Sequence, residues 1–525
     1  MNSGASTADI KNYVESGWWE KSKSLSDIVK DNAGSNPSGV AYISDVGNLN
    51  WDSYHRWALA ISEKLLTMTE VGERVLVWMP DSGGVHAAYL GSERAGVIVV
   101  GVGWRAGLKE LAHLAESTGA QLLLSIAETP LGEIAQVADK LDIDYLTIEE
   151  SFEDRRVYLS ENSSLPALVG PSDLWFINST SGTTGLPKCV MQTQNRWFYF
   201  HKKAVDFGNL TNEETWMSVV PAPFGFGLWT AHFTPTLLGV PCVVQEKFNA
   251  RKAAELIEKH AVTVLCAVSS QFVMILDESK ELDLSSLNIV FTGGEAISPQ
   301  RAEELEKKSG CKVLNFYGSN ETGTLSGTTI YDPPNKRHTT GGQIISEMEV
   351  RLYDPETGKR LDSVGVGQPA CKGPALSLGY WKDSKANKEL MTDDGWFLMG
   401  DLVEIDDKGW LKVVGRTSDF IIRGGKNISS VAVEREVEAH PKVALAAVVA
   451  KPHPKLGETA VACVQLHKDQ SLTMGELKDF LRENGVTIDW WPETLEVMDE
   501  LPLSSGGKVA KGELKELFCN RAEVK

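Results

Sequence analysis

Runs of apolar residues alternate with amphipathic segments through the first third of the chain. Residues 74–79, 97–102 and 121–126 are short and nearly continuous apolar runs, the pattern of strands that are buried on both faces. Residues 85–94 and 108–118 lie between these runs and predict helices, the second of which is followed by a glycine suited to end it. The alternation therefore predicts a parallel sheet covered by helices.

The alternation resumes after residue 173 and changes near residue 340. Helices are expected at residues 252–260 and 299–308, and six further apolar runs predict strands at residues 174–177, 216–220, 242–245, 262–267, 289–292 and 313–316. Beyond residue 340 strands and turns dominate, with a strand at 349–353 and a hairpin signal at 406–409. We predict an α/β fold with a large N-terminal domain of mostly parallel sheets and a small α+β C-terminal domain.

Composition narrows the class of protein. The 525 residues include 52 Lys and Arg against 71 Asp and Glu, a formal net charge of −19 that disfavours general binding of nucleic acid or anionic membrane. The seven cysteines are scattered without a C-x-x-C pair, which indicates reduced thiols. The N-terminal segment shows no signal-peptide pattern, and the longest apolar run, at 95–104, is too short to span a bilayer. We expect a soluble cytoplasmic protein without stable membrane insertion.

A loop rich in glycine and hydroxyl groups follows the predicted strand at 174–177. Its sequence, from Asn178 to Lys188, is NSTSGTTGLPK. Glycines let backbone N–H groups approach anionic oxygens, hydroxyls add donors, and lysine adds positive charge, so the segment suits phosphate binding. It lacks the residue order of the common P-loop. A polar surface loop is the alternative for any run of this composition.

The order STSGTTGLPK resembles the phosphate-binding loop of the adenylate-forming enzymes, a superfamily of acyl-CoA synthetases, amino-acid adenylation domains and luciferases. The resemblance implies that ATP is bound by Ser179, Thr180, Ser181, Gly182, Thr183, Thr184, Gly185 and Lys188. It also implies that Thr184 helps to hold a metal ion.

Further segments resemble motifs of the same family in the family's order. The segment Thr292-Gly-Gly-Glu resembles the one that lies against adenine, and the segment from 315 to 323 resembles the Tyr-Gly-x-Thr-Glu motif. These motifs imply nucleotide contacts for Gly293, Gly294, Glu295, Asn315, Tyr317, Gly318, Ser319 and Asn320. Glu321 corresponds to the Mg²⁺ ligand, a role suited to a hard oxygen donor. Asn320 stands where threonine is usual, which puts its phosphate contact in question.

The C-terminal motifs imply a moving domain. Asp401 corresponds to the residue that binds both ribose hydroxyls, and Arg416 to a nucleotide contact. Ser418 corresponds to the hinge, where relatives usually carry Asp or Lys, so the resemblance divides the chain into residues 1–417 and a mobile lid of residues 418–525. Lys508 corresponds to the catalytic lysine that also contacts ATP, although Leu503 replaces a basic residue of that motif.

The resemblance implies an enzyme that uses ATP, Mg²⁺ and coenzyme A, with Lys508 and Glu321 as its catalytic residues. A carboxylic acid would become an acyl-AMP with release of pyrophosphate, and a thiol would then displace AMP. The backbone of Gly424 and Gly425 would line the channel for the coenzyme A thiol. Two other classes stay open: a ligase that loads a carrier-protein phosphopantetheine, and a non-catalytic nucleotide-binding homologue. The sequence does not decide whether the chain forms a homodimer.

The acyl substrate is indicated by the segment PAPFGFGLW at 221–229. Gly225 stands where amino-acid adenylation domains carry an Asp, so a substrate ammonium would lack its partner and amino acids are disfavoured. The segment is aromatic, and the predicted acyl pocket consists of Phe224, Phe226, Trp229, Gly294 and Gly318. Candidate substrates are bulky alicyclic, aromatic or steroid-side-chain acids and fatty acids. The alternative for Phe226 and Trp229 is that they belong to the core of a helix. His232, one turn further along, is expected to be a packing residue and not a catalyst.

Overall fold

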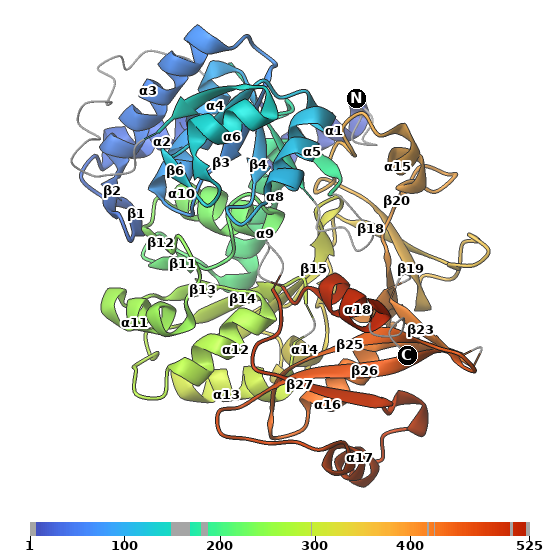
Figure 1. The fold of residues 1–525 in the computed structure, drawn as a ribbon. Coiled ribbons are helices and arrows are strands. Elements are labelled where there is room, and N and C mark those ends of the chain that lie inside the picture. Colours follow the sequence, from blue (N-terminus) through green and yellow to red (C-terminus); the bar gives the residue numbers. More distant parts are fainter. Residues whose placement is uncertain are drawn as a thin grey trace.

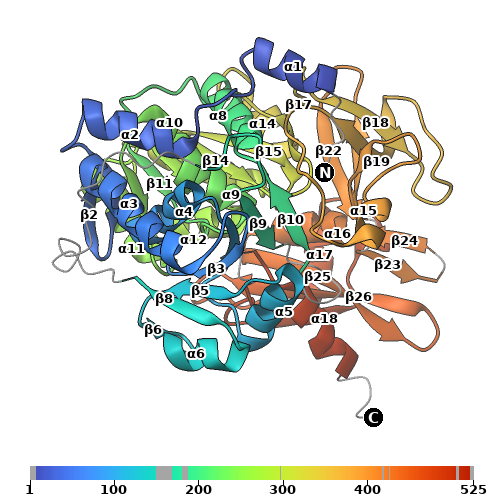
Figure 2. The same cartoon turned by 90° about the horizontal axis from the view of Figure 1, so that it is seen from above.

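The computed structural model describes residues 7–148, 168–179, 187–295, 297–416, 419–424, 426–503 and 508–520. Within these residues the strands form four main sheets. In Figure 1 the C-terminal strands and helices, coloured orange and red, lie below the green and yellow strands of the nine-stranded sheet. Figure 2 shows the N-terminal helices and the sheets they cover from above.

The first sheet has six strands, and all its pairings are parallel except that of β10 with β9. Its order is β10 (Cys189–Gln192), β9 (Phe176–Ser179), β4 (Ile98–Val102), β3 (Arg74–Trp78), β5 (Leu122–Ser125) and β8 (Asp144–Thr147). The strands predicted at 74–79, 97–102 and 121–126 are confirmed as β3, β4 and β5, whereas the strand predicted at 174–177 begins two residues later, as β9. The predicted helix at 108–118 is α5 (Leu108–Thr118), which ends at Gly119 with a φ of +67°. A short hairpin, β6 (Glu128–Thr129) and β7 (Gly132–Glu133), precedes α6 (Ile134–Leu141).

The second sheet has nine strands, parallel in its centre and antiparallel at both edges. Its order is β17 (Gln343–Ile344), β16 (Gly323–Gly327), β15 (Lys312–Ser319), β14 (Ile289–Gly293), β13 (Val264–Cys266), β11 (Trp216–Ser218), β12 (Cys242–Val244), β1 (Val40–Ser44) and β2 (Gly47–Asn50). β15 extends three residues beyond the predicted strand, so Tyr317, Gly318 and Ser319 belong to a strand and not to a loop.

Helices cover both faces of the nine-stranded sheet, and two clusters of buried apolar side chains mark these faces. The helices of the N-terminal part are α1 (Thr7–Glu15), α2 (Leu25–Ser35), α3 (Trp51–Met68), α4 (Gly83–Ala95), α8 (Gln194–Gly208), α9 (Gly225–Gly227), α10 (Thr234–Leu238), α11 (Ala250–His260), α12 (Ser269–Glu278), α13 (Pro299–Ser309), α14 (Pro334–Thr339) and α15 (Ser384–Glu389). A π-helical turn, Leu228–Phe233, joins α9 to α10.

A third, antiparallel sheet accounts for the strands predicted beyond residue 340. It contains β18 (Glu349–Tyr353), β19 (Gly365–Lys372), β20 (Phe397–Leu398), β21 (Asp401–Ile405) and β22 (Leu411–Arg416). The predicted strand at 349–353 coincides with β18. The side chains of this sheet share a buried cluster with Tyr317 of β15, which places the sheet beside the end of that strand.

The C-terminal part has its own sheet and its own core. Its elements are β23 (Phe420–Arg423), β24 (Lys426–Ser429), α16 (Ser430–Glu438), β25 (Val443–His453), β26 (Gly457–Leu466), α17 (Met474–Glu483), the 3₁₀ turn Ile488–Trp490, β27 (Thr494–Met498) and α18 (Lys511–Asn520). The predicted hinge, Ser418, and the boundary beside it lie outside the described residues. A second apolar cluster runs from α11–α13 to β25, β26 and α18, so the two parts share buried surface.

Two expectations about the chain as a whole can be compared with the structure. Six cysteines of the described residues are buried free thiols, which confirms the expectation of reduced cysteines for those six. In the part of the chain that the structure describes, no helix is both long and apolar enough to cross a membrane.

Candidate active site

The predicted nucleotide residues lie where the carboxyl ends of strands from the two parallel sheets meet. β9 ends at Ser179, whereas β14 and β15 of the larger sheet end at Gly293 and Ser319. The side-chain amide of Asn178 donates to Oδ1 of Asn320 at 3.2 Å and so joins the ends of β9 and β15. In open α/β sheets, the carboxyl ends of parallel strands are the usual place for a ligand.

Close backbone packing explains the glycines at these strand ends. A methyl group on Gly318 would lie 1.9 Å from the carbonyl oxygen of Gly323, and one on Gly293 would lie 2.6 Å from that of Phe316. Gly294 has a φ of +77°, a left-handed conformation that disfavours other residues. The glycines therefore leave bare backbone at the position predicted for adenine.

The predicted ribose residue lies in a network of three side chains. The hydroxyl of Tyr317 donates to Oδ2 of Asp401 at 2.9 Å, and Nε of Arg416 lies 3.3 Å from Oδ1 of the same carboxylate. Asp401 and Arg416 are directly opposite each other in the pairing of β21 with β22. Burial and the Asp401 charge hold the pKa of Tyr317 well above its ordinary value, so this hydroxyl stays a donor. The carboxylate is 18% exposed and accessible to a ligand.

The C-terminal part brings Lys508 to the strand end at Gly294. A methyl group on Gly294 would lie 2.6 Å from Nζ of Lys508, so the ammonium rests against this backbone. The next residue, Val509, donates its N–H to Oε1 of Glu295 at 3.3 Å. Oε2 of Glu295 accepts from the backbone and hydroxyl of Ser270, both at 3.0 Å. Glu295 therefore links the loop after β14 to the segment that carries Lys508.

Burial and the nearby guanidinium of Arg416 lower the pKa of Lys508. Its pKa is lowered from the ordinary value first by burial and then by the positive charge of Arg416, while Glu295 and Asp401 oppose this change. Two cations near one another, with two carboxylates nearby, create a position that favours an anion. An entering phosphate would relieve the repulsion between the ammonium and the guanidinium.

Glu321 follows β15 and is held by a tyrosine that the sequence motifs do not indicate. The hydroxyl of Tyr380 donates to Oε1 of Glu321 at 2.7 Å, and Nζ of Lys188 lies 4.9 Å from the centre of the Tyr380 ring. In nucleotide sites Mg²⁺ is usually bound by one or two carboxylates together with phosphate oxygens, so a single hard carboxylate at this place fits that ion. The other predicted metal ligand, Thr184, lies outside the described residues.

Asn320, which replaces the usual threonine, directs its amide toward β9. In addition to accepting from Asn178, it donates through Nδ2 to the carbonyl oxygen of Ser179 at 3.4 Å. Its Oδ1 also fills the space above Gly225, where a methyl group would come within 2.3 Å of this oxygen. The amide thus holds the base of the glycine–hydroxyl loop and closes the position at which amino-acid adenylation domains carry a carboxylate.

A buried arginine behind the motif is a second group that sequence reasoning missed. Arg196, on α8, is 1% exposed and donates to the carbonyl oxygens of Asn320 (2.7 Å) and Ala375 (2.9 Å). Burial lowers the pKa of Arg196 to about 9, and the charge of Glu321 opposes the shift. A single charged residue in the aromatic run RWFYF is the signal that could have drawn attention to it.

Not all predicted residues are brought together. Asn315 donates its amide to the carbonyl oxygen of Thr340 at 2.8 Å, which supports the loop that follows α14. Gly424 lies at the turn between β23 and β24, where its N–H donates to the carbonyl of Leu456 within the C-terminal part. The remaining predicted residues, Thr180 to Gly185 of the loop and Gly425 of the channel, lie outside the described residues.

The predicted acyl segment forms an aromatic wall around a π-helical turn. Phe224 and Phe226 are half-buried, while Trp229 is fully buried and stacks on Phe200 at 4.4 Å between ring centres and on Phe226 at 5.4 Å. Trp229 therefore belongs to the core, and the more exposed Phe224 and Phe226 remain the predicted contacts for a substrate. π-Helical turns often occur at functional sites.

His232, in the same π-helical turn, is a packing residue. Its ring stacks on Trp175, and its Nδ1 lies 3.2 Å from Nδ1 of His86. Burial lowers the pKa of His86 to about 3 and that of His232 well below its ordinary value, so both imidazoles are neutral at pH 7. In the described part of the chain, Nε2 of each ring has no hydrogen-bond partner.

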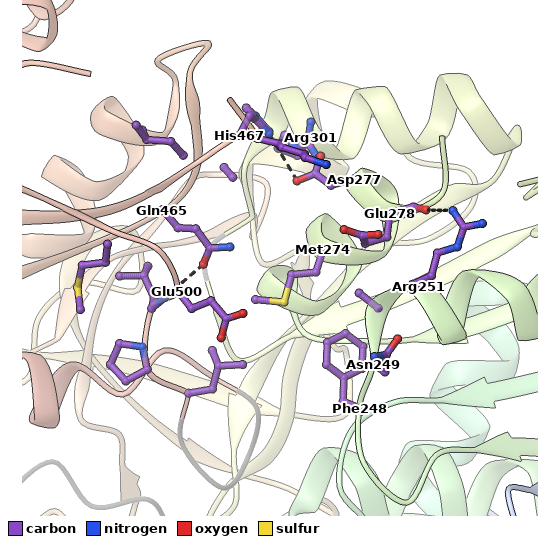
Figure 3. Close-up of a pocket in the computed structure, with 18 of the residues that line it drawn as sticks. Phe248, Asn249, Arg251, Met274, Asp277, Glu278, Arg301, Gln465, His467 and Glu500 are labelled. Atoms are coloured by element: carbon purple, nitrogen blue, oxygen red, sulfur yellow. Dashed lines mark hydrogen bonds and ion pairs between the residues drawn. The ribbon is translucent and has the colours of Figure 1, made fainter. Parts of the chain in front are cut away.

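A cleft of about 2390 Å³ lies between α11, α12 and α13 of the N-terminal part and the segments after β26 and before α18 of the C-terminal part, and none of the described nucleotide residues lines it. Figure 3 shows an ion pair across it: Nδ1 of His467, which follows β26, lies 3.5 Å from Oδ2 of Asp277 at the end of α12. Arg301 of α13 pairs with the other oxygen of Asp277. Burial opposes ionisation of Asp277, but His467 and Arg301 hold its pKa below the ordinary value.

The larger part thus brings the strand ends together, and the smaller part brings Lys508 to them. Residues 29–381 match the family model "AMP-binding enzyme", and residues 432–508 match "AMP-binding enzyme C-terminal domain". The chain therefore belongs to the AMP-binding enzyme family, and the resemblance to adenylate-forming enzymes is confirmed.

Several relatives match over nearly the whole chain. The medium-chain fatty-acid–CoA ligase of Escherichia coli K12 is 28% identical over 97% of this chain and 93% of its own length. The vibriobactin-specific 2,3-dihydroxybenzoate-AMP ligase of Vibrio cholerae is 27% identical over 96% of each. The crystal structure of ATP-bound MatB from Rhodopseudomonas palustris superposes with a TM-score of 0.82 at 25% identity, over 94% of this chain and 99% of MatB.

Proposed function

We propose that the protein is an AMP-forming acyl-CoA synthetase, which converts a hydrophobic carboxylic acid through an acyl-AMP to its coenzyme A thioester. The observation that carries the proposal is the position of Lys508. Its ammonium rests on the backbone of Gly294, next to the network of Tyr317, Asp401 and Arg416. The smaller domain thus places a positive charge next to the side chains and the bare backbone that are predicted to bind the nucleotide.

In the first half-reaction, the substrate carboxylate would attack the α-phosphate of ATP and release pyrophosphate. Negative charge increases where these two anions meet, and the ammonium of Lys508 would stabilise it, a type of contribution often worth about 10²–10³ in rate. Asp401 would accept hydrogen bonds from the ribose, and the backbone at Gly294 would lie against adenine. Charge neutralisation at the triphosphate is the chemistry that Mg²⁺ supplies when Glu321 and phosphate oxygens bind it.

In the second half-reaction, the coenzyme A thiol would attack the acyl carbonyl and displace AMP. Gly424, the predicted channel residue, lies at a hairpin turn within the C-terminal domain while Lys508 occupies the site. The same domain would therefore rotate about the predicted hinge at Ser418 between the two steps. A hinge of this kind works by absorbing backbone dihedral changes in a few residues.

The acid is proposed to be aromatic, alicyclic or otherwise apolar. Phe224 and Phe226 offer a half-buried aromatic wall, and Asn320 closes the space above Gly225 where a carboxylate would be needed to bind a substrate ammonium. An uncompensated buried ammonium would be costly, so amino acids fit poorly. The similarity to a fatty-acid–CoA ligase and to a dihydroxybenzoate-AMP ligase supports the same range of acids.

A carrier-protein thiol is the second candidate acceptor, because a relative named as an acid–AMP ligase matches as fully as the one named as a CoA ligase. The test is exchange of labelled pyrophosphate into ATP with a panel of aryl, alicyclic, steroid-side-chain and fatty acids, followed by thioester formation with free coenzyme A. We expect acid-dependent exchange and a CoA thioester. Exchange without a CoA thioester would favour the carrier-loading ligase, and no exchange with any acid would contradict the proposed adenylation.

A further inference from the structure

Tyr380 lies between the two predicted phosphate-site charges that come from different sheets. Lys188 precedes β10 of the six-stranded sheet, whereas Glu321 follows β15 of the nine-stranded sheet. The Tyr380 hydroxyl donates to Oε1 of Glu321 at 2.7 Å, and its ring lies 4.9 Å from the Lys188 ammonium. One side chain therefore contacts both charged groups.

The backbone around Tyr380 is fixed from both sides. Its N–H donates to Oδ1 of Asn387 at 2.7 Å, and Nδ2 of Asn387 donates back to the Tyr380 carbonyl at 2.7 Å. An isolated antiparallel bridge to Val190 ties the same residue to β10. Because the side chain is only 7% exposed, the position of the hydroxyl is determined by packing as well as by the backbone.

The hydroxyl is suited to orient a metal-binding carboxylate. A phenol hydroxyl, whose ordinary pKa is about 10, is protonated near neutral pH, so at 2.7 Å it donates to the Glu321 carboxylate. The bond occupies Oε1 and leaves the lone pairs of Oε2 for another ligand. Outer partners of this kind typically change metal affinity by about 10–100-fold when they are removed.

We propose that Tyr380 is a positioning residue of the nucleotide–metal site, with a hydroxyl that orients the Glu321 carboxylate for a divalent cation and a ring that holds Lys188 beside the phosphates. The inference rests on the proposed ATP site. It adds Tyr380 to that site and assigns separate tasks to the hydroxyl and to the ring of this side chain.

The decisive variant is Tyr380→Phe, which removes the hydroxyl and keeps the ring against Lys188. Mn²⁺ binding is measured by electron paramagnetic resonance with the enzyme saturated by α,β-methylene-ATP, which cannot release pyrophosphate. We expect about a tenfold loss of Mn²⁺ affinity, with unchanged affinity for the nucleotide in EDTA. Tyr353→Phe is the matched control, because that hydroxyl donates to Asp394 at 2.9 Å outside the site, and it should leave both affinities unchanged.

The ring is tested by Tyr380→Leu, which should also weaken binding of the nucleotide in EDTA, because Lys188 loses its support. Thermal unfolding of each variant establishes that it is folded. Unchanged Mn²⁺ affinity in Tyr380→Phe would overturn the proposal. So would a loss of nucleotide affinity in EDTA by Tyr380→Phe as large as its loss of Mn²⁺ affinity, because that would make Tyr380 a purely structural residue.

Glu321→Gln separates this proposal from the function on which it rests. We expect Glu321→Gln to weaken Mn²⁺ binding and the double variant with Tyr380→Phe to weaken it no further, because the hydroxyl acts through the carboxylate. If Glu321→Gln weakens Mn²⁺ binding and Tyr380→Phe does not, only the positioning role fails. If Glu321→Gln has no effect, the metal site itself is wrongly assigned and the positioning role fails with it.

Discussion

Substitution of Gly225 by alanine should damage the phosphate site, although Gly225 lies in the predicted acyl segment. The new methyl group would lie 2.3 Å from Oδ1 of Asn320, whereas ordinary van der Waals contact begins near 3.4 Å. The oxygen must therefore move by about 1 Å, a shift on the scale that overpacking enforces. That movement breaks the hydrogen bond from Asn178, which is already 3.2 Å long.

The expected cost is the sum of a steric and a polar contribution. Overpacking typically costs about 1–3 kcal/mol, which includes the shift of the displaced side chain. Each lost hydrogen bond adds about 0.5–1.5 kcal/mol. Asn320 also holds the carbonyl of Ser179 at the base of the loop. The steric contribution lowers the stability of the fold, whereas the loss of the two hydrogen bonds of Asn320, together about 1–3 kcal/mol, acts on the site, so we expect Gly225→Ala to lower kcat/KM for adenylation by about 10–100-fold.

A double-mutant cycle measures the interaction directly. In an Asn320→Ala background the obstructing oxygen is gone, and the nearest remaining contact of the methyl group is Cη2 of Trp197 at 3.2 Å. Gly225→Ala should then cost only a few tenths of a kcal/mol, a coupling of about 1 kcal/mol or more. Gly475→Ala is the matched control, since its methyl group would meet only the Thr473 hydroxyl at 3.8 Å.

The assay is acid-dependent pyrophosphate exchange, combined with thermal unfolding of all variants. The steric reasoning is refuted if the effects of Gly225→Ala and Asn320→Ala are additive within about 0.5 kcal/mol, or if Gly225→Ala exchanges pyrophosphate like the unmodified protein. A loss that appears equally in Gly475→Ala would show a general effect of alanine instead of a contact with Asn320.

Three further predictions concern the smaller domain and its contact with the larger one. Lys508→Ala should slow single-turnover pyrophosphate release about 10²–10³-fold and spare thioester formation from added acyl-AMP; equal damage to both steps would contradict its assigned role. Burial and then the charge of Glu434 raise the pKa of Glu438 from 4.5 to about 8. Between these pH values the folded protein keeps a proton that the unfolded chain releases, so the free energy of unfolding decreases as the pH rises from 4.5 to about 8. Glu438→Gln should flatten this decline in the unfolding midpoint. Asp277→Asn weakens the contact with His467, which joins α12 of the larger domain to the segment after β26 of the smaller domain. Because Lys508 is then held less firmly at the site, we expect adenylation to slow about two- to fivefold, with a smaller effect in high salt; equal slowing at low and high salt would refute the electrostatic role.

The sequence predicts elements better than it predicts the contacts between them. The helix at 108–118 matches residue for residue, because its apolar stripe and its terminal glycine are both local signals. The strand that holds Tyr317 was expected to end at residue 316, three residues before β15 ends in the structure. In the structure, β15 continues through Gly318 because β16 pairs with it there, Gly318 opposite Thr324, and the close approach of the Gly323 carbonyl leaves no room for a side chain on Gly318.

The missed site residues show why motifs are incomplete. The bond between Tyr380 and Glu321 joins positions 59 residues apart, and Arg196 supports the carbonyl of Asn320 from 124 residues away. No short pattern in one sequence records such pairings. The approach of Lys508 to the strand end at Gly294 is what the resemblance implies, whereas the hydrogen bond from the Asn320 amide to the end of β9 is visible only in the folded structure.

The π-helical turn at Leu228–Phe233 makes the aromatic wall sensitive to chain length. A π-turn holds about one residue more than an α-turn, so removing one residue here would restore an α-helix. Each residue of an α-helix advances the side-chain direction by about 100°. A deletion between Trp229 and His232 would therefore rotate the stacked pair of Phe226 and Trp229 relative to His232, which stacks on Trp175. Single-residue insertions and deletions in this turn are thus a route by which the pocket could acquire a new acid preference while every motif of the nucleotide site stays intact.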